Sequence, residues 1–400
     1  MDLALPGDDH PARVEFRTWL GSNPDPSPRQ LAEAGYVAPH WPRPWGLDAD
    51  PIAQLVIDDE MRRAGVRRPS NQIGIGWAGP TLVHAGTEAQ KNRYLVPLLA
   101  GEEIWCQLFS EPGAGSDLAG LSTRAVRDGD EWVVTGQKVW TSFAHVAALG
   151  ILLARTDPDV EKHRGISYFV CPMDAPGVTI RPIVDMTGEH AFNEVFLDEV
   201  RLPAQNLVGE VNGGWALAKV TLGNERVSLS GEGALWGQGP TAGDLLDIVR
   251  RGGGTRDATL RQRLARLWAE SEVLRLIRLR TVSAAVAGRA PGPEASVRKA
   301  LADDHGQRVM ELAHDIAGPY GLLADCGPAE GLAPVGAGTG SPWPASVWAK
   351  GYLFSMALTI GGGTSEVQRN IIAERVLGLP HDVDVEAARS WAQSRGALQG

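Results

Sequence analysis

Cysteine and long apolar runs are scarce in this sequence of 400 residues. The three cysteines, Cys106, Cys171 and Cys326, are too few and too scattered for a disulfide framework or a cysteine-rich metal site. We therefore expect them to be core residues of a protein from a reducing compartment. No uninterrupted apolar run approaches the roughly 18 residues of a membrane-spanning helix, and the acidic, proline-broken residues 1–9 differ from a signal or transit peptide. These absences predict a cytoplasmic protein with no membrane span and no bound metal.

Positive charge is also in the minority. The chain carries 38 Lys and Arg residues against 48 Asp and Glu, a net charge of −10. Because an acidic surface repels a polyanion, the composition excludes nucleic acid as a partner, although a local basic patch could still bind a phosphorylated ligand. The remaining composition, 43% hydrophobic and 22% charged, is typical of a globular enzyme. A chain of this length predicts two or three domains rather than one.

Apolar periodicity divides the chain into three parts. Helical spacing predicts helices over residues 10–21 and 50–65, and others that start near Gly79 and at Thr87, where Gln90 completes a capping-box pattern. After residue 104 the pattern alternates, and helical spacing returns after Gly214. We therefore predict an α+β protein. Its parts are an N-terminal helical domain (1–104), a β-domain (105–211) and a C-terminal helical domain (212–400).

The middle part is predicted to be a small β-barrel or sandwich. Residues 123–126 and 131–136 alternate across an Asp-Gly-Asp turn, a β-hairpin pattern, and residues 137–142 predict a third strand. Further strands are expected at 146–155, 165–172, 178–184 and 193–200. Beyond them we expect helices at 215–236, 259–287, 295–317, 346–360 and 365–377, and a loop at 327–344. These helices look like one half of a helical bundle. We expect another subunit to supply the surface against which they pack.

Candidate site residues gather in a loop that follows a strand. The residues CQLFS at 106–110 precede the run EPGAGSD at 111–117. Two glycines, a proline and a Ser-Asp pair free backbone N–H groups that can point at one ligand oxygen or ring edge. On this loop alone, an ordinary surface turn is the competing interpretation.

Three motifs together resemble those of a known family. The runs EPGAGSD at 111–117, GQKVWTS at 136–142 and GTSEVQRN at 363–370 are similar to the signatures of the FAD-dependent acyl-CoA dehydrogenases, in that family's order and spacing. The resemblance extends from residue 30 to residue 380. It implies the family's fold, with N-terminal helices, a middle β-barrel and a C-terminal helical bundle. It also implies oxidation of an acyl-CoA thioester to the trans-2-enoyl-CoA, with FAD as cofactor and an electron-transfer flavoprotein as acceptor.

By this resemblance, Trp140 would pack on the flavin ring, although a core tryptophan is the competing interpretation. Ser142 stands at a usual threonine and would keep its hydroxyl for the N5 region of the flavin, while Ser116 would face the CoA side. The implied cofactor-binding residues are Gln107, Leu108, Ser110, Gly115, Trp140, Ser142, Gly318, Gly321, Thr364 and Glu366. The implied substrate-binding residues are Ser116, Arg226 and Gly361.

The catalytic base departs from the commonest family pattern. Many members carry glutamate where this chain has Gly362, which keeps only the backbone N–H that, in the family, donates to the thioester carbonyl. A minority place the base in a Glu-Arg pair on the first long helix of the C-terminal domain, which here matches Glu225 and Arg226. We expect Glu225 to be the base, against the alternative of a solvated helix face. Glu232, nearly two helical turns later, is the second candidate.

Two further departures concern the shared cofactor site. The family's Arg-x-x-Phe-Gly segment is replaced by LDIVRRGGG at 246–254, and Asp315 stands at a usual glutamine, where an acid beside a pyrophosphate is unfavourable. The sequence therefore leaves open which subunit supplies these contacts. It favours self-association as a dimer or tetramer, or a hetero-oligomer. The alternatives are a non-catalytic partner subunit and a flavin monooxygenase or oxidase.

The glycines at 361 and 362 leave volume that would suit a branched, cyclic or steroidal acyl chain.

Overall fold

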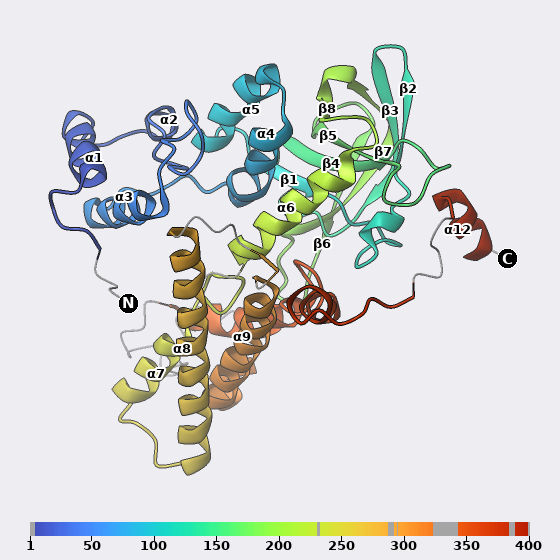
Figure 1. Cartoon of the computed structure of the whole chain (residues 1–400). Helices are drawn as coiled ribbons and strands as arrows, with labels where there is room; N and C mark the ends of the chain where they lie inside the picture. Colours follow the sequence, from blue (N-terminus) through green and yellow to red (C-terminus); the bar gives the residue numbers. More distant parts are fainter. Residues whose placement is uncertain are drawn as a thin grey trace. The chain divides into compact units, whose positions relative to one another are not determined.

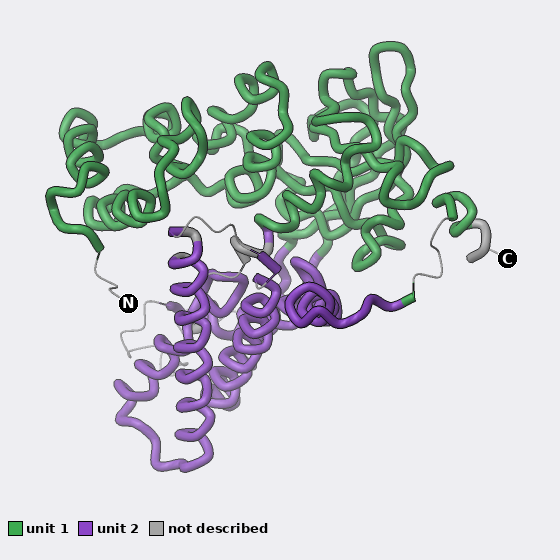
Figure 2. Tube along the Cα trace, in the orientation of Figure 1, with its two compact units in different colours: residues 1–183, 190–224, 383–400 green, residues 184–189, 225–382 purple. Residues whose placement is uncertain are grey.

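The computed structural model describes residues 5–229, 233–286, 292–293, 295–322, 343–383 and 389–398 (Figure 1). The predicted α+β fold, with helices before and after a mixed sheet, is confirmed. Contacts divide the chain into two compact units (Figure 2). The first unit comprises residues 1–183, 190–224 and 383–400, and the second comprises residues 184–189 and 225–382. The domain boundaries inferred from the sequence stay a prediction.

The first unit begins with short helices whose starts are set by local capping. They are α1 (Pro11–Ser22), α2 (Pro28–Glu33), α3 (Pro51–Ala64), α4 (Gly79–Ala85), which follows a π-helical turn, and α5 (Glu88–Ala100). The predicted capping box at Thr87 and Gln90 is present, since each side chain accepts a hydrogen bond from the other residue's N–H. Ser27 and Gln30 form a second one at the start of α2, a helix that the periodicity missed because it is only 6 residues long.

An eight-stranded sheet follows these helices. Its strands are β1 (Trp105–Leu108), β2 (Arg124–Asp128), β3 (Glu131–Lys138), β4 (Leu149–Arg155), β5 (Ile166–Pro172), β6 (Val178–Ile183), β7 (Phe192–Pro203) and β8 (Leu207–Val208). The order is β6-β7-β3-β2-β4-β5-β8, with β1 parallel to β4. The predicted β2–β3 hairpin is confirmed. The predicted third strand is wrong, because β3 runs on to Lys138 and the chain then leaves the sheet, with a left-handed backbone at Trp140.

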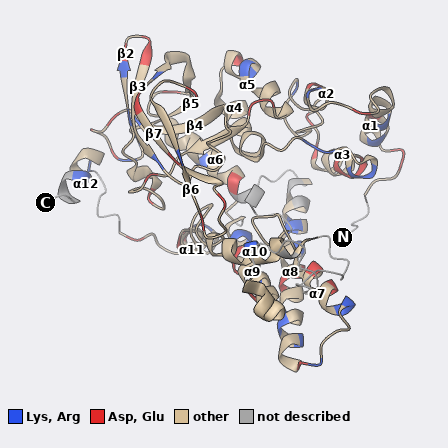
Figure 3. Ribbon diagram, turned by 180° about the vertical axis from the view of Figure 1, so that it is seen from behind, with Lys and Arg blue, Asp and Glu red and all other residues tan. Residues whose placement is uncertain are grey.

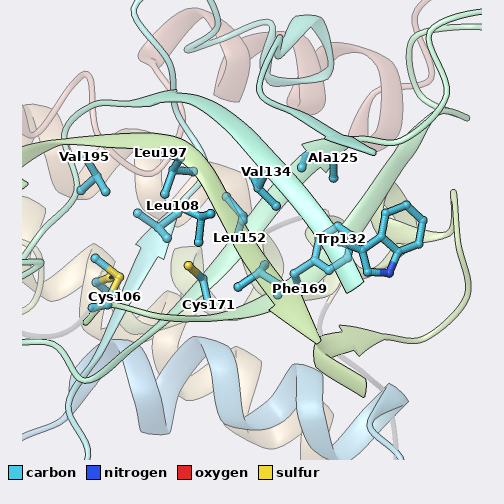
Figure 4. Packing of buried hydrophobic residues seen from close by; sticks show 14 of the residues in the cluster. Cys106, Leu108, Ala125, Trp132, Val134, Leu152, Phe169, Cys171, Val195 and Leu197 are labelled. Atoms are coloured by element: carbon cyan, nitrogen blue, oxygen red, sulfur yellow. Dashed lines mark hydrogen bonds between the residues drawn. The ribbon is translucent and has the colours of Figure 1, made fainter. Parts of the chain in front are cut away.

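Apolar side chains of these strands fill a continuous core, in which Cys106 and Leu108 from β1 gather with Cys171 from β5 (Figure 4). Alternate residues of β3 and β7, such as Val134 and Val195, are fully buried in the same core. The prediction that Cys106 and Cys171 are core residues is confirmed. Cys326 lies outside the described residues.

The second unit is helical. Its elements are the end of α6 (Gly214–Leu229), then α7 (Ala242–Arg251), α8 (Ala258–Val286), α9 (Ala295–Ala317), α10 (Ala345–Phe354) and α11 (Ser365–Ile371). The charged residues of α8 are mainly arginines (Figure 3). The short helix α12 (Trp391–Leu398) belongs to the first unit. In the described segments, no helix is long and apolar enough to span a bilayer, and no group of three His, Cys, Asp or Glu side chains could hold a metal ion.

Two helix predictions for this part of the chain need correction, and one helix was missed. The helix expected at 215–236 ends at Leu229, and the chain from Gly233 to Pro240 folds back through backbone hydrogen bonds. The helix ends there because of a tertiary contact. The Ala234 carbonyl oxygen comes so close to Gly306 of α9 that a Cβ on Gly306 would lie only 2.1 Å from it. The helix expected at 346–360 ends at Phe354, and α7 was not predicted. Most of the loop expected at 327–344 lies outside the described residues.

Candidate active site

A buried ion pair holds the loop at 109–115 to the end of β3. The Lys138 ammonium, fully buried, donates to the Glu111 carboxylate (2.9 Å) and to the Phe109 carbonyl (3.0 Å). The same carboxylate accepts the N–H groups of Ser122 (2.6 Å) and Thr123 (2.9 Å). Four hydrogen bonds from three donor groups, accepted by the Glu111 carboxylate and the Phe109 carbonyl, therefore fix the loop that the sequence identified as a candidate site.

The protonation states of this pair follow from burial and from its hydrogen bonds. Burial by itself would raise the pKa of Glu111, but the attraction of Lys138 and the N–H donors outweigh it, so that pKa lies below its usual value. Burial lowers the pKa of Lys138, and the attraction of Glu111 opposes that change. Both groups are charged when they interact, since each supplies the opposite charge that the interior otherwise lacks.

The Glu111–Lys138 ion pair, called the clamp below, brings the first two motifs together. The Val139 N–H donates to the Ser110 carbonyl (2.9 Å), so the loop and the segment after β3 run side by side. Asn193 fixes the far side of this segment, because its side-chain amide donates to the Thr141 carbonyl (3.0 Å) while its own carbonyl accepts the Thr141 N–H (3.0 Å). Asn193 is fully buried. No sequence pattern indicates the role of Asn193, because that role depends on a partner 52 residues away.

Trp140 stands out from this segment. Its backbone has φ 59°, a left-handed value that costs a bulky residue about 1–3 kcal/mol. Its ring is 60% exposed and meets Phe192 edge-on, with ring centroids 6.0 Å apart. The alternative of a core tryptophan that fills the barrel is therefore wrong. A strained backbone that presents a large aromatic ring outward keeps Trp140 as a candidate ligand contact.

The remaining site residues of the first unit lie around this loop and segment. Leu108 is fully buried and pairs with Leu152 in β4, so only its main chain can serve a ligand. Gln107, Ser110 and Ser142 are half-buried, whereas Gly115 and Ser116 are exposed on the loop. The structure thus brings Ser110 together with the segment that carries Trp140 and Ser142.

Glu225 lies on α6, one turn after Thr221. Its side chain is only 7% exposed, so the alternative of a solvated helix face is wrong for this residue. Thr221 anchors the same helix, because its hydroxyl hydrogen-bonds the hydroxyls of Thr81 (2.8 Å) and Tyr168 (3.1 Å). Arg226 also lies on α6, but its side chain is outside the described part of the structure. Glu232 lies outside it altogether.

The third motif forms a glycine turn before α11. Gly362 and Gly363 have φ values of 67° and 90°, which a residue with a side chain adopts only with strain. Thr364 caps α11, since its hydroxyl accepts the Val367 N–H (3.3 Å). Glu366, in the first turn of α11, is exposed and pairs with Arg369 (3.4 Å).

Trp236 fills the space beside this turn. A Cβ on Gly361 would lie 2.4 Å from Cζ2 of the Trp236 ring, and the ring also packs edge-on against Phe354. The sequence predicts open volume beside Gly361, but in the second unit the indole of Trp236 occupies that volume. Trp236 was missed because its position depends on the fold of the loop after α6, which periodicity interpreted as helix.

The end of α9 carries the residues that the sequence related to a shared cofactor site. Gly318 and Gly321 lie in the 3₁₀ turn Gly318–Leu322. Asp315, three residues before it, forms an ion pair with Arg263 of α8 (2.6 Å), and both side chains are about half-exposed. The acid at a usual glutamine therefore has its own cationic partner in this chain.

Comparison with known proteins gives the family to which the chain belongs. The chain matches the family models described as "Acyl-CoA dehydrogenase, N-terminal domain" at residues 15–102, "middle domain" at 106–200 and "C-terminal domain" at 212–377. The chain belongs to the acyl-CoA dehydrogenase family of oxidoreductases, whose members are flavoproteins with FAD as the standard cofactor.

Among its relatives, the chain is 43% identical over 350 residues to "Acyl-CoA dehydrogenase FadE34" of Mycobacterium tuberculosis, covering 88% of this chain and 45% of that protein. It thus spans about half the length of FadE34. It is 39% identical to "Acyl-CoA dehydrogenase IpdE1" of the same organism, covering 95% and 92% of the two chains. A solved structure named "Tcur3481-Tcur3483 steroid ACAD" matches with a TM-score of 0.76 and 31% identity, covering 96% of this chain and all of that one.

Proposed function

We propose that the chain catalyses the α,β-dehydrogenation of an acyl-CoA thioester and passes the electrons to an electron-transfer flavoprotein. The observation that carries this proposal is the buried carboxylate of Glu225 in a family member that has glycine at the commoner base position. The scarcity of cysteine supports a reducing, cytoplasmic setting.

The residues of the first unit fit a flavin. The exposed, strained Trp140 offers an aromatic face, and the Ser110 loop and Ser142 offer hydroxyl and backbone groups beside it. When bound, FAD supplies the acceptor for the hydride that leaves Cβ of the substrate. We propose that Ser110, Ser142 and the Leu108 main chain hydrogen-bond the ring, with Gln107 and Gly115 nearby. In the second unit, Thr364, Glu366, Gly318 and Gly321 are the proposed contacts for the rest of the cofactor.

The chain's own residues would remove the α-proton. A plain thioester α-carbon is far too weak an acid for a free carboxylate, so the enolate-like charge on the thioester oxygen must be stabilised while Glu225 accepts the proton. The Gly362 N–H is the proposed donor to that oxygen. Ser116 is the proposed contact on the CoA side, and Arg226 and Gly361 are further proposed contacts of the substrate.

The acyl group we propose is branched, cyclic or steroidal. A solved relative is named as a steroid enzyme, and the absence of a side chain at Gly362 leaves room that a larger residue would close. Trp236 limits this room on one side of Gly361, so it would set the upper size of the acyl chain.

A second candidate is a subunit of a mixed oligomer. The Phe-Gly pair that the family uses in a cross-subunit contact is absent from this chain. Asp315 stands where the family usually has glutamine, and it forms an ion pair with Arg263. The solved relative is named by two proteins joined. We propose self-association as the primary assembly, with a hetero-oligomer as the alternative.

The test is an anaerobic spectral titration of the purified, yellow protein with a panel of acyl-CoAs. Bleaching of the flavin absorbance by a bulky acyl-CoA is the expected result. Stoichiometric peroxide in air would reassign the protein as an oxidase, and incorporation of oxygen into the product would reassign it as a monooxygenase. Colourless protein that binds no added FAD, alone or with a co-expressed relative, would remove the dehydrogenase proposal.

The base is tested by Glu225→Gln. The amide keeps the size of the side chain but cannot accept a proton, so flavin reduction should slow by about 10²-fold or more, with FAD content and ligand binding unchanged. Gly362→Glu in this background is expected to recover only part of the rate, because φ 67° disfavours a side chain there. A Glu225→Gln enzyme reduced at the wild-type rate would exclude Glu225, and Glu232 would be tested next.

A further inference from the structure

One buried lysine ties α9 to the glycine turn. Lys299 is 1% exposed, and its ammonium donates to the carbonyls of Gly361 (2.7 Å), Leu358 (3.0 Å) and Gly363 (3.2 Å). Its counter-ion is Asp303, one helical turn along, at 2.5 Å. All of these groups belong to the second unit.

The shortest of the three carbonyl contacts is made to a particular peptide unit. The Gly361 carbonyl and the Gly362 N–H belong to the same peptide group, which is trans. In a planar trans peptide these two bonds point in opposite directions. The lysine that holds the carbonyl therefore also fixes the direction of the N–H. Among the described residues, none accepts a hydrogen bond from the Gly362 N–H.

A full positive charge on this carbonyl does more than orient it. An ammonium draws electron density toward the oxygen, and hydrogen bonds in series polarise one another in a low-dielectric interior. The N–H at the other end of the peptide becomes a stronger donor. Burying an ion pair costs several kcal/mol of desolvation, and apolar residues would stabilise the fold as well. The charge is thus better explained by the peptide it polarises than by stability.

Gln368 provides an internal comparison. Its side-chain amide donates to the carbonyls of Gly362 (3.1 Å) and Gly363 (3.2 Å), which belong to the next two peptides along the chain. The turn is thus held by two side chains, but only the charged one holds the peptide that carries the Gly362 N–H.

We propose that Lys299 is a positioning residue for catalysis, which orients and polarises the 361–362 peptide so that its N–H stabilises negative charge on the thioester oxygen. The proposal rests on the proposed function in one respect, that this N–H meets the substrate carbonyl. Lys299 itself touches neither substrate nor cofactor. Asp303 serves it as counter-ion.

The test measures enolate stabilisation separately from turnover. Acetoacetyl-CoA has an acidic α-proton but no hydrogen on its β-carbon, so it can form an enolate and cannot reduce the flavin. The ratio of bound enolate to bound keto form is followed by ultraviolet absorbance against pH, on the FAD-loaded protein. The double variant Lys299→Met/Asp303→Asn removes both charges together, and so avoids leaving a lone buried carboxylate.

We expect the double variant to lower the enolate-to-keto ratio about 10-fold or more, toward the roughly 10²–10³ lost when a whole oxyanion donor is removed. Its FAD content and its affinity for CoA should be unchanged. Asp303→Asn alone keeps the carbonyl contacts and should retain most of the ratio. Gln368→Met, which alters only the neighbouring peptides, should lower it less than the double variant does.

An unchanged ratio in the folded double variant would overturn the proposal while leaving the dehydrogenase function intact. A wild-type protein that does not enolise acetoacetyl-CoA would also overturn it. Conversely, a wild type that enolises this probe in a Lys299-dependent manner but is reduced by no acyl-CoA would refute the dehydrogenation and support the role of Lys299.

Discussion

Asp303 is a buried carboxylate whose titration should be visible in stability. Burial raises its pKa to about 7, against the attraction of Lys299, from an ordinary value of 3.8. Between these two values the folded chain binds more protons at this position than the unfolded chain, so the free energy of unfolding falls as pH rises. Asp303→Asn removes this dependence. The difference in free energy of unfolding between the variant and wild type should therefore shift in favour of the variant by about 1 kcal/mol or more between pH 4 and pH 7.

Denaturant unfolding at several pH values measures this difference. A difference between Asp303→Asn and wild type that stays flat over the range would contradict the raised pKa.

Trp236 and Gly361 compete for one volume, which predicts non-additive effects on stability. Gly361→Ala places a Cβ 2.4 Å from the indole and should cost about 1–3 kcal/mol through overpacking. In a Trp236→Ala background the same change should cost much less, because the clash is gone. Thermal or urea unfolding of the two single variants and the double variant gives the coupling. Equal costs of Gly361→Ala in both backgrounds would show that the indole does not occupy this space.

At the scale of elements, the clamp between β3 and the Ser110 loop should contribute more to the free energy of unfolding than an exposed ion pair on the same strand. Lys138→Met leaves Glu111 buried without its cation, and breaking a buried pair costs about 3–5 kcal/mol. Because the loop then loosens, FAD affinity should fall as well. Arg201→Gln is the matched control, since its partner Glu131 lies on β3 but both side chains are about half-exposed, and exposed pairs contribute at most about 1 kcal/mol.

Urea unfolding of the FAD-free protein and a fluorescence titration with FAD give the two quantities. Lys138→Met and Arg201→Gln losing equal stability would argue against the clamp.

A helix or strand boundary could be predicted from the sequence when residues next to it determine it, and could not when a distant contact does. The cap at Thr87 and the hairpin turn at Gly129 are local, and the structure confirms them. The end of α6 was not predictable, because it depends on a close approach to Gly306, more than 70 residues away. Motifs located the candidate site, but its supports, Asn193 and Lys299, act through contacts 52 to 64 residues distant. Only the Lys299–Asp303 spacing of one helical turn was visible in the sequence.

For the assembled molecule, we predict that the end of α9 affects how cofactor binding depends on charge. If a subunit presents Asp315 near the FAD pyrophosphate, the acid opposes binding even when Arg263 partly neutralises it. Asp315→Gln should therefore tighten FAD binding several-fold, with a larger gain at low salt. Titration of FAD-free protein with FAD, with the mass of the complex measured in parallel, tests this. No change in affinity would mean that this part of α9 does not contact the cofactor.

The packing of Trp236 on Gly361 also constrains how this protein can evolve. The two positions lie 125 residues apart, yet a side chain at 361 has no space until the indole is gone, and losing the indole alone leaves a void. Neither substitution is neutral in isolation, so the order in which they are accepted matters. A lineage that acquired this tryptophan made its glycine hard to replace, and any route back to a larger residue there passes through a less stable intermediate.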